Sequence, residues 1–276
     1  MLRIALICLS LLFCHVGSAE SAGGQTESAV DWLNAHGGDA PFMLLGEKHG
    51  TREIPRFVAD FLRAQPEDQA LTLGLEYPCS EQSAFERFLD SDGGAAARAA
   101  LRASSYWQVT NDQHDGRRSE DMLDLLEAVR QIRASGRDIA VLAYDLAPGT
   151  KHDHHSRDKM MAESLRAARQ ERPDRRLLVL TGNVHAMKAR PSYAPPEMQQ
   201  PMASYLADLK PLAVNIEANS GEFWGCRGSC GPVAAGNSGA THRVEQGGPY
   251  DLRLVLPEFS VARLLGGESA QSQSPL

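Results

Sequence analysis

The chain has 276 residues, of which 42% are hydrophobic and 23% charged, a balance typical of a globular protein with a sizeable core. Its formal net charge of -7 argues against a nucleic-acid-binding protein, because proteins that follow a phosphate backbone are usually basic. The basic pairs Arg117-Arg118 and Arg175-Arg176 lie among acids and form no extended basic stretch.

The first residues have the pattern of a secretory signal peptide. Arg3 precedes an apolar run at 4–13, and Gly17-Ser18-Ala19 offers small residues for cleavage. We therefore expect a signal peptide at 1–19 and a periplasmic or secreted mature chain. An uncleaved anchor and a lipid anchor at Cys14 are the alternatives. After removal of this segment, no remaining stretch is long and apolar enough to be expected to span a membrane.

Strands and helices are predicted in alternation along the rest of the chain. Apolar runs bounded by turn residues predict strands, and apolar residues at helical spacing predict helices. In chain order, the elements are a helix at 29–35, a strand at 41–46, a helix at 52–64, a strand at 70–76, helices at 80–89, 95–103 and 119–136, a strand at 138–145, a helix at 156–172, and strands at 176–181, 212–216 and 250–256.

This alternation predicts an α/β fold with a mainly parallel central sheet and helices on both faces. No repeat or linker divides residues 20–276, so we expect a single domain. The Gly- and Ser-rich region 221–248 is predicted to be a long loop or irregular hairpin, and 267–276 a polar tail.

Three cysteines follow the predicted signal peptide, and an exported protein meets an oxidising compartment. Cys226 and Cys230 are expected to close a small loop, although Cys79 could pair with either. A zinc site built from these three thiols lacks a fourth ligand and is the less favoured interpretation.

Polar, reactive residues follow four predicted strands at the point where each strand ends. In parallel α/β sheets, ligands bind outside the carboxyl ends of the strands, so this edge is the expected site. Each residue alone has a structural explanation, such as a helix cap or a hydrogen-bonded histidine, but together they indicate a site. They are Glu47 and His49 after the first strand, Glu76 and Tyr77 after the second, Asp145 after the third, and Asn183 and His185 after the fourth.

Two types of chemistry fit this set. A carboxylate beside an imidazole makes a general base. Alternatively, His49, His185, Glu47 and Glu76 could ligate a divalent metal that activates water. The His-rich segment 151–155 could gather a metal or be a solvated loop, which is the favoured interpretation. No serine-nucleophile elbow, phosphate-binding loop or dinucleotide fingerprint follows a predicted strand.

Five short motifs resemble, in order, those of erythromycin esterase-like proteins. They are Gly46 to Glu53, Leu75-Glu76, Tyr144-Asp145, the segment beginning Arg157-Asp158, and Gly182-Asn183-Val184-His185. The wider superfamily includes the ChaN-like haem-binding proteins and the Tiki and TraB proteins. The resemblance covers residues 42–188.

The resemblance implies an α/β fold whose catalytic group matches Glu47, His49, Glu76 and His185, with His49 as the water-activating base. In the Tiki branch it implies metal-dependent peptide cleavage, and in the ChaN-like branch haem binding. One residue separates Glu47 from His49 here, whereas the esterases usually have two. This spacing is closer to that of the ChaN-like and TraB-like branches.

Two hypotheses follow. The first is an exported hydrolase that acts on an ester, lactone or amide bond of a small-molecule or peptide substrate. In it, Arg52 or Arg157 stabilises a developing oxyanion, and Tyr77, Asp145 and Asn183 bind substrate. The second is a haem- or iron-binding protein without turnover, with His49, His185 or Tyr77 as axial ligand. A degenerate family member with a structural role is a third possibility.

Overall fold

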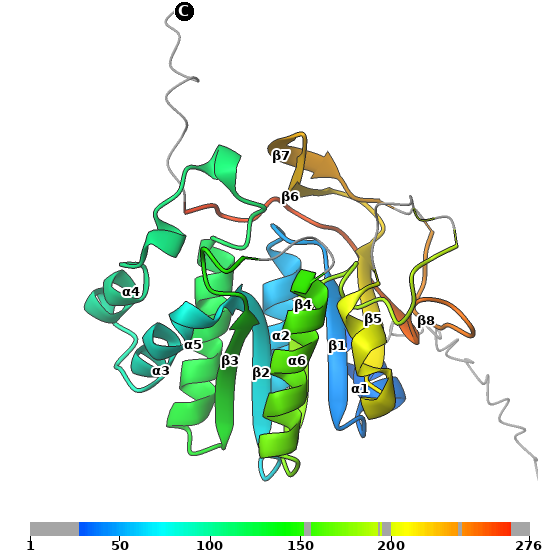
Figure 1. Ribbon diagram of the computed structural model, residues 1–276, viewed down its shortest axis with the longest axis horizontal. Coiled ribbons are helices and arrows are strands. Elements are labelled where there is room, and N and C mark those ends of the chain that lie inside the picture. Colours follow the sequence, from blue (N-terminus) through cyan, green and yellow to red (C-terminus); the bar gives the residue numbers. More distant parts are fainter. Residues whose placement is uncertain (1–27, 152–155, 193, 195–199, 237–238, 266–276) are drawn as a thin grey trace, which may run out of the picture.

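The computed structural model describes residues 28–151, 156–192, 194, 200–236 and 239–265 (Figure 1). Most of its strands join one seven-stranded sheet, in the order β3-β2-β4-β1-β5-β9-β8, and a separate hairpin joins β6 to β7. The strands are β1 (Phe42–Glu47), β2 (Leu71–Pro78), β3 (Ile139–Asp145), β4 (Arg176–Gly182), β5 (Leu212–Ala218), β6 (Glu222–Arg227), β7 (Ser229–Ala234), β8 (Arg243–Val244) and β9 (Leu252–Leu256).

All neighbouring strands of the large sheet pair in parallel except β8, which runs antiparallel to β9. The predicted mainly parallel α/β sheet is thus confirmed. β1 lies between β4 and β5, with Leu45 opposite Leu180 on one side and Val214 on the other. This order places the carboxyl ends of β1, β2, β3 and β4 next to one another at one edge.

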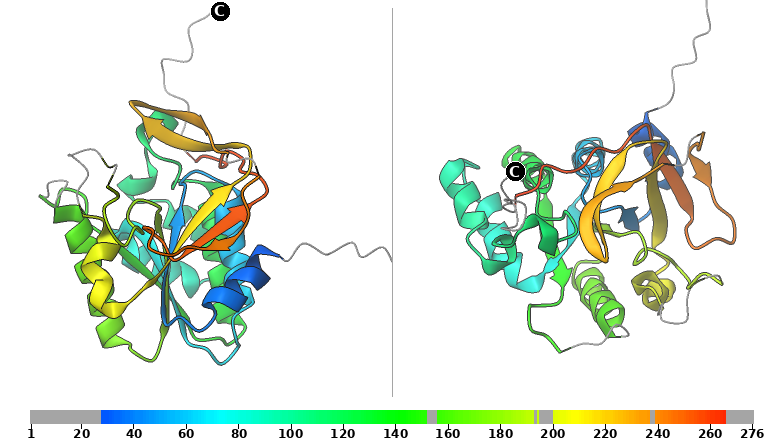
Figure 2. Two further views of the ribbon diagram at one scale, coloured as in Figure 1. Left: turned by 90° about the vertical axis from the view of Figure 1, so that its right-hand side faces the viewer. Right: turned by 90° about the horizontal axis from the view of Figure 1, so that it is seen from above.

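Helices cover both faces of the sheet (Figure 2). The larger apolar cluster packs α1 (Ala29–Gly37), α2 (Glu53–Arg63), α3 (Gln82–Leu89) and α5 (Glu120–Ala134) against one face. The other face is covered by α6 (Ser156–Glu171) and the 3-10 helix η4 (Met202–Leu209). Because both faces are buried, β1 and β4 consist of buried residues throughout. Short peripheral elements complete the fold: α4 (Ala95–Leu101) and the 3-10 helices η1 (Cys79–Glu81), η2 (Ser105–Trp107) and η3 (Asn111–Gln113).

The region predicted to be a loop or irregular hairpin forms the antiparallel pair β6–β7. Its end is closed by a disulfide between Cys226 and Cys230, which confirms the predicted pairing, and Cys79 is a free, exposed thiol. In Figure 1 this hairpin stands above the sheet, beyond the carboxyl ends of the strands. It therefore lies over the edge at which the sequence predicts the site.

Three predictions fall outside the described residues: the signal peptide, most of the His-rich segment 151–155, and the polar tail. Among the residues that the structure does describe, no helix combines the length and the apolar character that crossing a membrane requires.

Candidate active site

The turn after β1 brings three distant segments together. Gly50 has a positive φ of 70°, and its carbonyl accepts hydrogen bonds from the main-chain N–H groups of Trp224 and Ala262, both at 2.9 Å. Gly116 lies so close that a Cβ on it would sit 2.3 Å from the Gly50 Cα. Only glycine fits at this contact, which fixes the 111–118 loop and the β6–β7 hairpin beside His49.

His49 is oriented by Glu47. The imidazole Nδ1 lies 3.0 Å from Glu47 Oε1, so Nδ1 carries the proton and Nε2 is the basic nitrogen when the ring is neutral. Burial of the ring disfavours its charged form. The negative charges of Glu47 and Asp115 and the hydrogen bond to Glu47 outweigh this effect, and the pKa of His49 is raised above its ordinary value.

Glu76 at the end of β2 is the most highly coordinated carboxylate of the site. One oxygen, Oε2, accepts hydrogen bonds from the Thr181 hydroxyl at 2.9 Å and from the Gly182 N–H at 2.7 Å. The other, Oε1, accepts from Arg117 at 3.0 Å and Arg157 at 2.9 Å. Burial opposes ionisation, but the surrounding positive charges, first His185 and then Arg117, keep the pKa of Glu76 well below its ordinary value.

Arg117 and Arg157 link Glu76 to two further carboxylates. Arg157 binds Asp145 through two parallel hydrogen bonds, Nε to Oδ1 at 3.1 Å and Nη2 to Oδ2 at 2.7 Å. Arg117 binds Asp115 in the same bidentate way, at 2.9 Å from Nη2 to Oδ2. Burial works against the charge of both arginines, but the carboxylates, Asp115 for Arg117 and Glu76 for Arg157, raise their pKa values. Both guanidiniums therefore stay charged at the cleft.

His185 follows β4 in a turn and faces the same network. Its Nδ1 lies 2.7 Å from Asp158 Oδ1, and its Nε2 lies 3.1 Å from Arg157 Nη1. The position of Gly182 shows how near the two imidazoles are: a Cβ there would lie 3.1 Å from His49 Nε2 and 3.2 Å from His185 Cδ2. The structure therefore brings His49, His185 and Glu76 around one point.

Of these groups, Glu47, His49, Asp115 and His185 line a cleft of about 490 Å³. Strand-end residues form its floor, and the β6–β7 hairpin forms one wall with Phe223, Trp224 and Arg227. Asn183 also lines the cleft, with its main-chain N–H bonded to the Glu47 carbonyl at 2.9 Å. The cleft thus combines a polar floor that carries two imidazoles with a partly aromatic wall.

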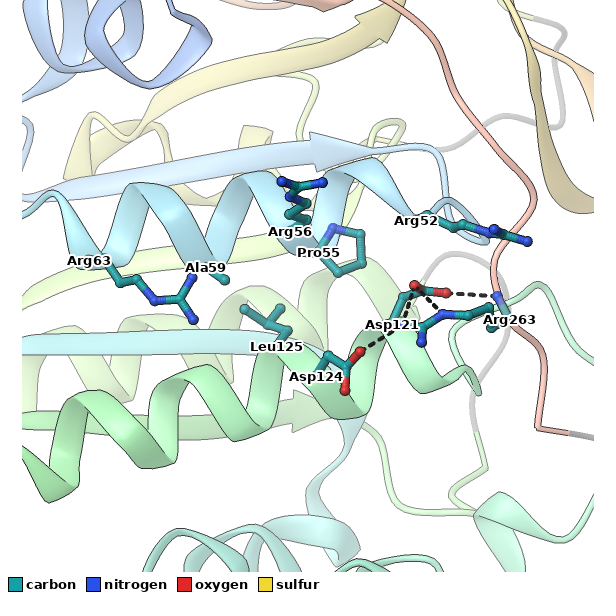
Figure 3. A pocket seen from close by; sticks show the side chains of 9 residues that line it. All are labelled: Arg52, Pro55, Arg56, Ala59, Arg63, Asp121, Asp124, Leu125 and Arg263. Atoms are coloured by element: carbon teal, nitrogen blue, oxygen red, sulfur yellow. Dashed lines mark hydrogen bonds and ion pairs between the residues drawn. The ribbon is translucent and has the colours of Figure 1, made fainter.

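Arg52 lies outside this cleft, which corrects its predicted place in the site. Its guanidinium donates to the Val261 carbonyl at 2.8 Å and lines a separate pocket between α2 and α5 (Figure 3). Helix α2 starts directly after Arg52 and turns this side chain away from the strand ends. Of the two arginines proposed for the oxyanion, only Arg157 reaches the site.

The predicted place of Tyr77 in the site is also wrong. Its side chain is 1% exposed and packs among Phe85, Tyr106 and Trp107. The hydroxyl donates to the Arg117 carbonyl at 2.6 Å, so it positions the 111–118 loop and faces no substrate or haem. Alternation along β2 explains this, because neighbours in a strand point to opposite faces.

The sequence interpretation missed Asp115, Arg117 and the pairing of Asp158. Asp158, which the sequence analysis assigns only to a motif, accepts a hydrogen bond from the Met202 N–H at 3.0 Å and so connects His185 to η4. Asp115 and Arg117 come from a loop that is far from any strand along the chain. The only local signal was the Asp-Gly-Arg sequence, whose glycine has a positive φ of 92°.

The donor set does not fit a divalent metal. All four hydrogen bonds to Glu76 come from protein groups, and two guanidiniums bring positive charge to the place where a cation would bind. Among the described residues, no group of three or more His, Cys, Asp or Glu side chains is arranged to hold a metal ion. No catalytic step is therefore derived through a metal.

The order and direction of the strands and the helices on both faces define the class of fold: that of erythromycin esterase-like structures. A mutant of the erythromycin esterase EreC in its open conformation matches with a TM-score of 0.60 and 11% identity, over 82% of this chain and 93% of the esterase. A succinoglycan biosynthesis protein matches with a TM-score of 0.59 and 10% identity, over 85% and 92% of the two chains.

A protein from Bacillus cereus matches with a TM-score of 0.54 and 12% identity, over 87% of this chain and 94% of its own. No family model matches the sequence, and no curated protein matches it. The structural matches confirm the fold that the resemblance implied. At these identities they establish the fold alone.

Proposed function

We propose that this protein is a hydrolase that activates water with His49 and cleaves an ester, lactone or amide bond. The observation that carries this proposal is the meeting of His49 Nε2, His185 and Glu76 around Gly182 on the floor of an open cleft. The fold shared with an erythromycin esterase supports it.

His49 has the features of a general base. Glu47 holds Nδ1 and directs Nε2 toward the cleft, and carboxylate and imidazole together accept a proton more readily than imidazole alone. In the proposed reaction, a water molecule attacks the carbonyl carbon while its proton passes to His49 Nε2. The C–O or C–N bond then breaks, and the leaving group takes the proton from His49.

Arg157 is the candidate for stabilising the negative oxygen that forms during attack. Its side chain is one quarter exposed and contacts His185, which lines the cleft, and its carboxylate partners Asp145 and Glu76 hold the guanidinium in place. A fixed donor beside a developing charge lowers the barrier without reorganisation during the reaction. His185, held by Asp158 and next to Arg157, is placed to position this guanidinium or to serve as a second base.

Haem binding is the weaker candidate. Tyr77 is enclosed in the core, and the Nε2 atoms of His49 and His185 lie 3.9 Å and 3.7 Å from Glu76 oxygens, within the ionic network. The residues that the structure describes offer no observation that favours an axial iron ligand over a catalytic imidazole.

We also propose that the protein is exported. The disulfide in the β6–β7 hairpin supports this, because such bonds persist in oxidising compartments. The mature amino terminus of the purified periplasmic or secreted protein tests the predicted cleavage after residue 19.

A hydrolysis screen tests the function. Purified wild-type protein is assayed against panels of 4-nitrophenyl esters, lactones and peptides, beside His49→Ala and the matched control His36→Ala. His36 lies on α1, away from the cleft, where its Nδ1 donates to the Trp32 carbonyl at 2.8 Å and its ring stacks on the Trp32 ring. We expect His49→Ala to lower kcat by about 10²- to 10⁴-fold. Equal activity in wild type and His49→Ala would remove the proposed base.

A further inference from the structure

Two cationic side chains lie together on the hairpin side of the cleft. Lys48 stands between Glu47 and His49 in the turn after β1, and Arg227 ends β6. Both line the cleft that holds the imidazoles. Within the described part of the chain, neither has a hydrogen bond or ion pair with a carboxylate, and the Lys48 ammonium lies over the Phe223 ring, 5.9 Å from its centroid.

Their charges are not offset by their surroundings. The pKa of Lys48 is lowered by burial and then by the positive charge of Arg227, which shows that the two cations repel each other. The charge of Glu217 acts in the opposite direction and raises the pKa of Lys48, but one of its oxygens is already bound by Arg253 and the Asn215 amide. An anion between Lys48 and Arg227 would relieve this repulsion.

The carboxylates that line the cleft are already bound to other side chains. Glu47 is bound to His49, and Asp115 to Arg117. Neither is available to neutralise the hairpin side. The cleft is therefore divided: its floor holds paired charges, while the side formed by Lys48 and Arg227 carries unpaired positive charge.

The wall between these two parts is aromatic. Phe223 and Trp224 line the cleft beside Lys48, and the Trp224 indole is fixed by its hydrogen bond to the His114 carbonyl at 2.9 Å. A flat apolar surface next to two cations suits a carboxylate attached to a planar or apolar group.

We propose that Lys48 and Arg227 form a carboxylate subsite, so that the substrate carries an anionic carboxylate next to the bond placed over His49. This proposal rests on the hydrolase function proposed above, and it names the substrate class of the same cleft. Both residues set specificity, and neither takes part in the proton transfer.

Equilibrium binding tests the subsite without requiring turnover. Isothermal titration calorimetry compares benzoate with its neutral isostere benzamide on wild type, Lys48→Met, Arg227→Gln and the control Lys210→Met. Lys210 lies between η4 and β5, outside the cleft. We expect wild type and Lys210→Met to bind benzoate about tenfold more tightly than benzamide, which corresponds to about 1.4 kcal/mol.

Lys48→Met should reduce this preference to near unity, and Arg227→Gln, an exposed substitution that leaves folding intact, should reduce it severalfold. The proposal is overturned if wild type binds benzamide as well as benzoate, or binds neither at millimolar concentrations. A preference unchanged in both variants would place the anion at Arg157 and also overturn it. Lys48-dependent binding in a protein that hydrolyses nothing would instead contradict only the hydrolase proposal.

Discussion

Arginines with several partners lie at both edges of the central sheet, and the two edges use them differently. At the amino edge, Arg175 and Arg176 are each 5% exposed. Arg176 donates to the Ala40 carbonyl and the Gly37 carbonyl, both at 2.9 Å, and to the Gln65 side chain. Its charge therefore serves mainly to satisfy main-chain carbonyls where loops meet the strands.

Arg175 at the amino edge binds one carboxylate, Asp138, at 2.6 Å, whereas at the carboxyl edge Arg117 and Arg157 share one carboxylate and each binds a second. Glu76 accepts from both guanidiniums, and Asp115 and Asp145 each bind one of them in bidentate fashion. Two imidazoles adjoin the same network.

The difference shows what distinguishes the candidate active site from a purely structural contact in this fold. A hollow of about 310 Å³ also lies at the amino edge, so neither a buried arginine nor a cavity is decisive. The residues lining that hollow include no histidine. At the carboxyl edge, by contrast, two histidines lie among carboxylates and arginines beside an open cleft, and titratable groups that perturb one another gather at functional sites.

Glu76→Gln should show the largest effect. Removing this charge leaves Arg117 and Arg157 without their shared partner and turns an amide N–H toward protein donors. We expect a loss of about 3 kcal/mol in the free energy of unfolding and a fall in kcat of about 10³-fold. Urea unfolding and kinetics on the same preparation measure both.

The matched control is Glu81→Gln. Glu81 is also buried, but it accepts hydrogen bonds from the neutral Ser104 hydroxyl and Trp107 indole, at 2.8 Å and 3.2 Å. We expect only about 1 kcal/mol of destabilisation and an unchanged kcat. Equal losses of activity in the two variants would mean that Glu76 acts through stability alone.

Arg117→Met and Arg176→Met compare the two edges directly. Each removes a guanidinium with several hydrogen-bond acceptors and leaves those acceptors unpaired, so each should cost about 2–3 kcal/mol of stability. Only Arg117→Met should also lower kcat, by about 10²-fold, because it frees Asp115 and Glu76 beside His49. The measurement is kcat per folded molecule, with the folded fraction taken from circular dichroism. Loss of kcat in folded Arg176→Met would contradict the assignment of the amino edge to structure.

Much of this comparison could be predicted from the sequence. Buried strands show as short apolar runs, and the parallel order follows from their alternation with helices, so Glu47, Glu76, Asp145 and His185 could be assigned to one edge. The roles of arginines could not be predicted in this way. Arg175-Arg176 and Arg117-Arg118 look alike as sequence, and only the partners supplied by distant segments separate them.

Two further residues show the same limit. Arg52 adjoins the first motif, but the helix that begins at Glu53 directs it away from the cleft. The 111–118 loop is far from any strand along the chain, although it contacts β2 and β6 in space. Its approach to His49 depends on the contact between Gly50 and Gly116. Long-range contacts of this kind leave little local pattern in the chain.

The pH dependence of activity should reveal the state of His49. As the base it must be neutral, and its pKa is raised, so kcat/KM should rise with pH through a midpoint above about 6.5. The sign for stability is opposite. Charged His49 stabilises the fold below its ordinary pKa, and this contribution disappears as pH rises through the raised value. Activity should thus increase while this contribution to stability declines.

Glu47→Gln sharpens this test. Removing the negative charge and its hydrogen bond takes away the main causes that raise the pKa of His49, while burial continues to lower it. The acidic limb of the kcat/KM profile should therefore move to lower pH by about one unit or less. A limb that stays in place would show that a group other than His49 controls it.

Arg52→Ala should have the smallest effect. It tests whether a residue that adjoins the first motif in the sequence contributes to activity when its side chain lies outside the cleft. Arg52 is exposed and makes one hydrogen bond, to the Val261 carbonyl. We expect kcat to be unchanged and stability to fall by about 0.5 kcal/mol or less. Arg157→Ala, beside it in the same assay, should lower kcat by about 10²-fold because its guanidinium contacts Glu76, Asp145 and His185. If Arg52→Ala instead matched that loss, the pocket between α2 and α5 would have to contribute to the reaction, and the contrast between the strand-end cleft and the rest of the surface would fail.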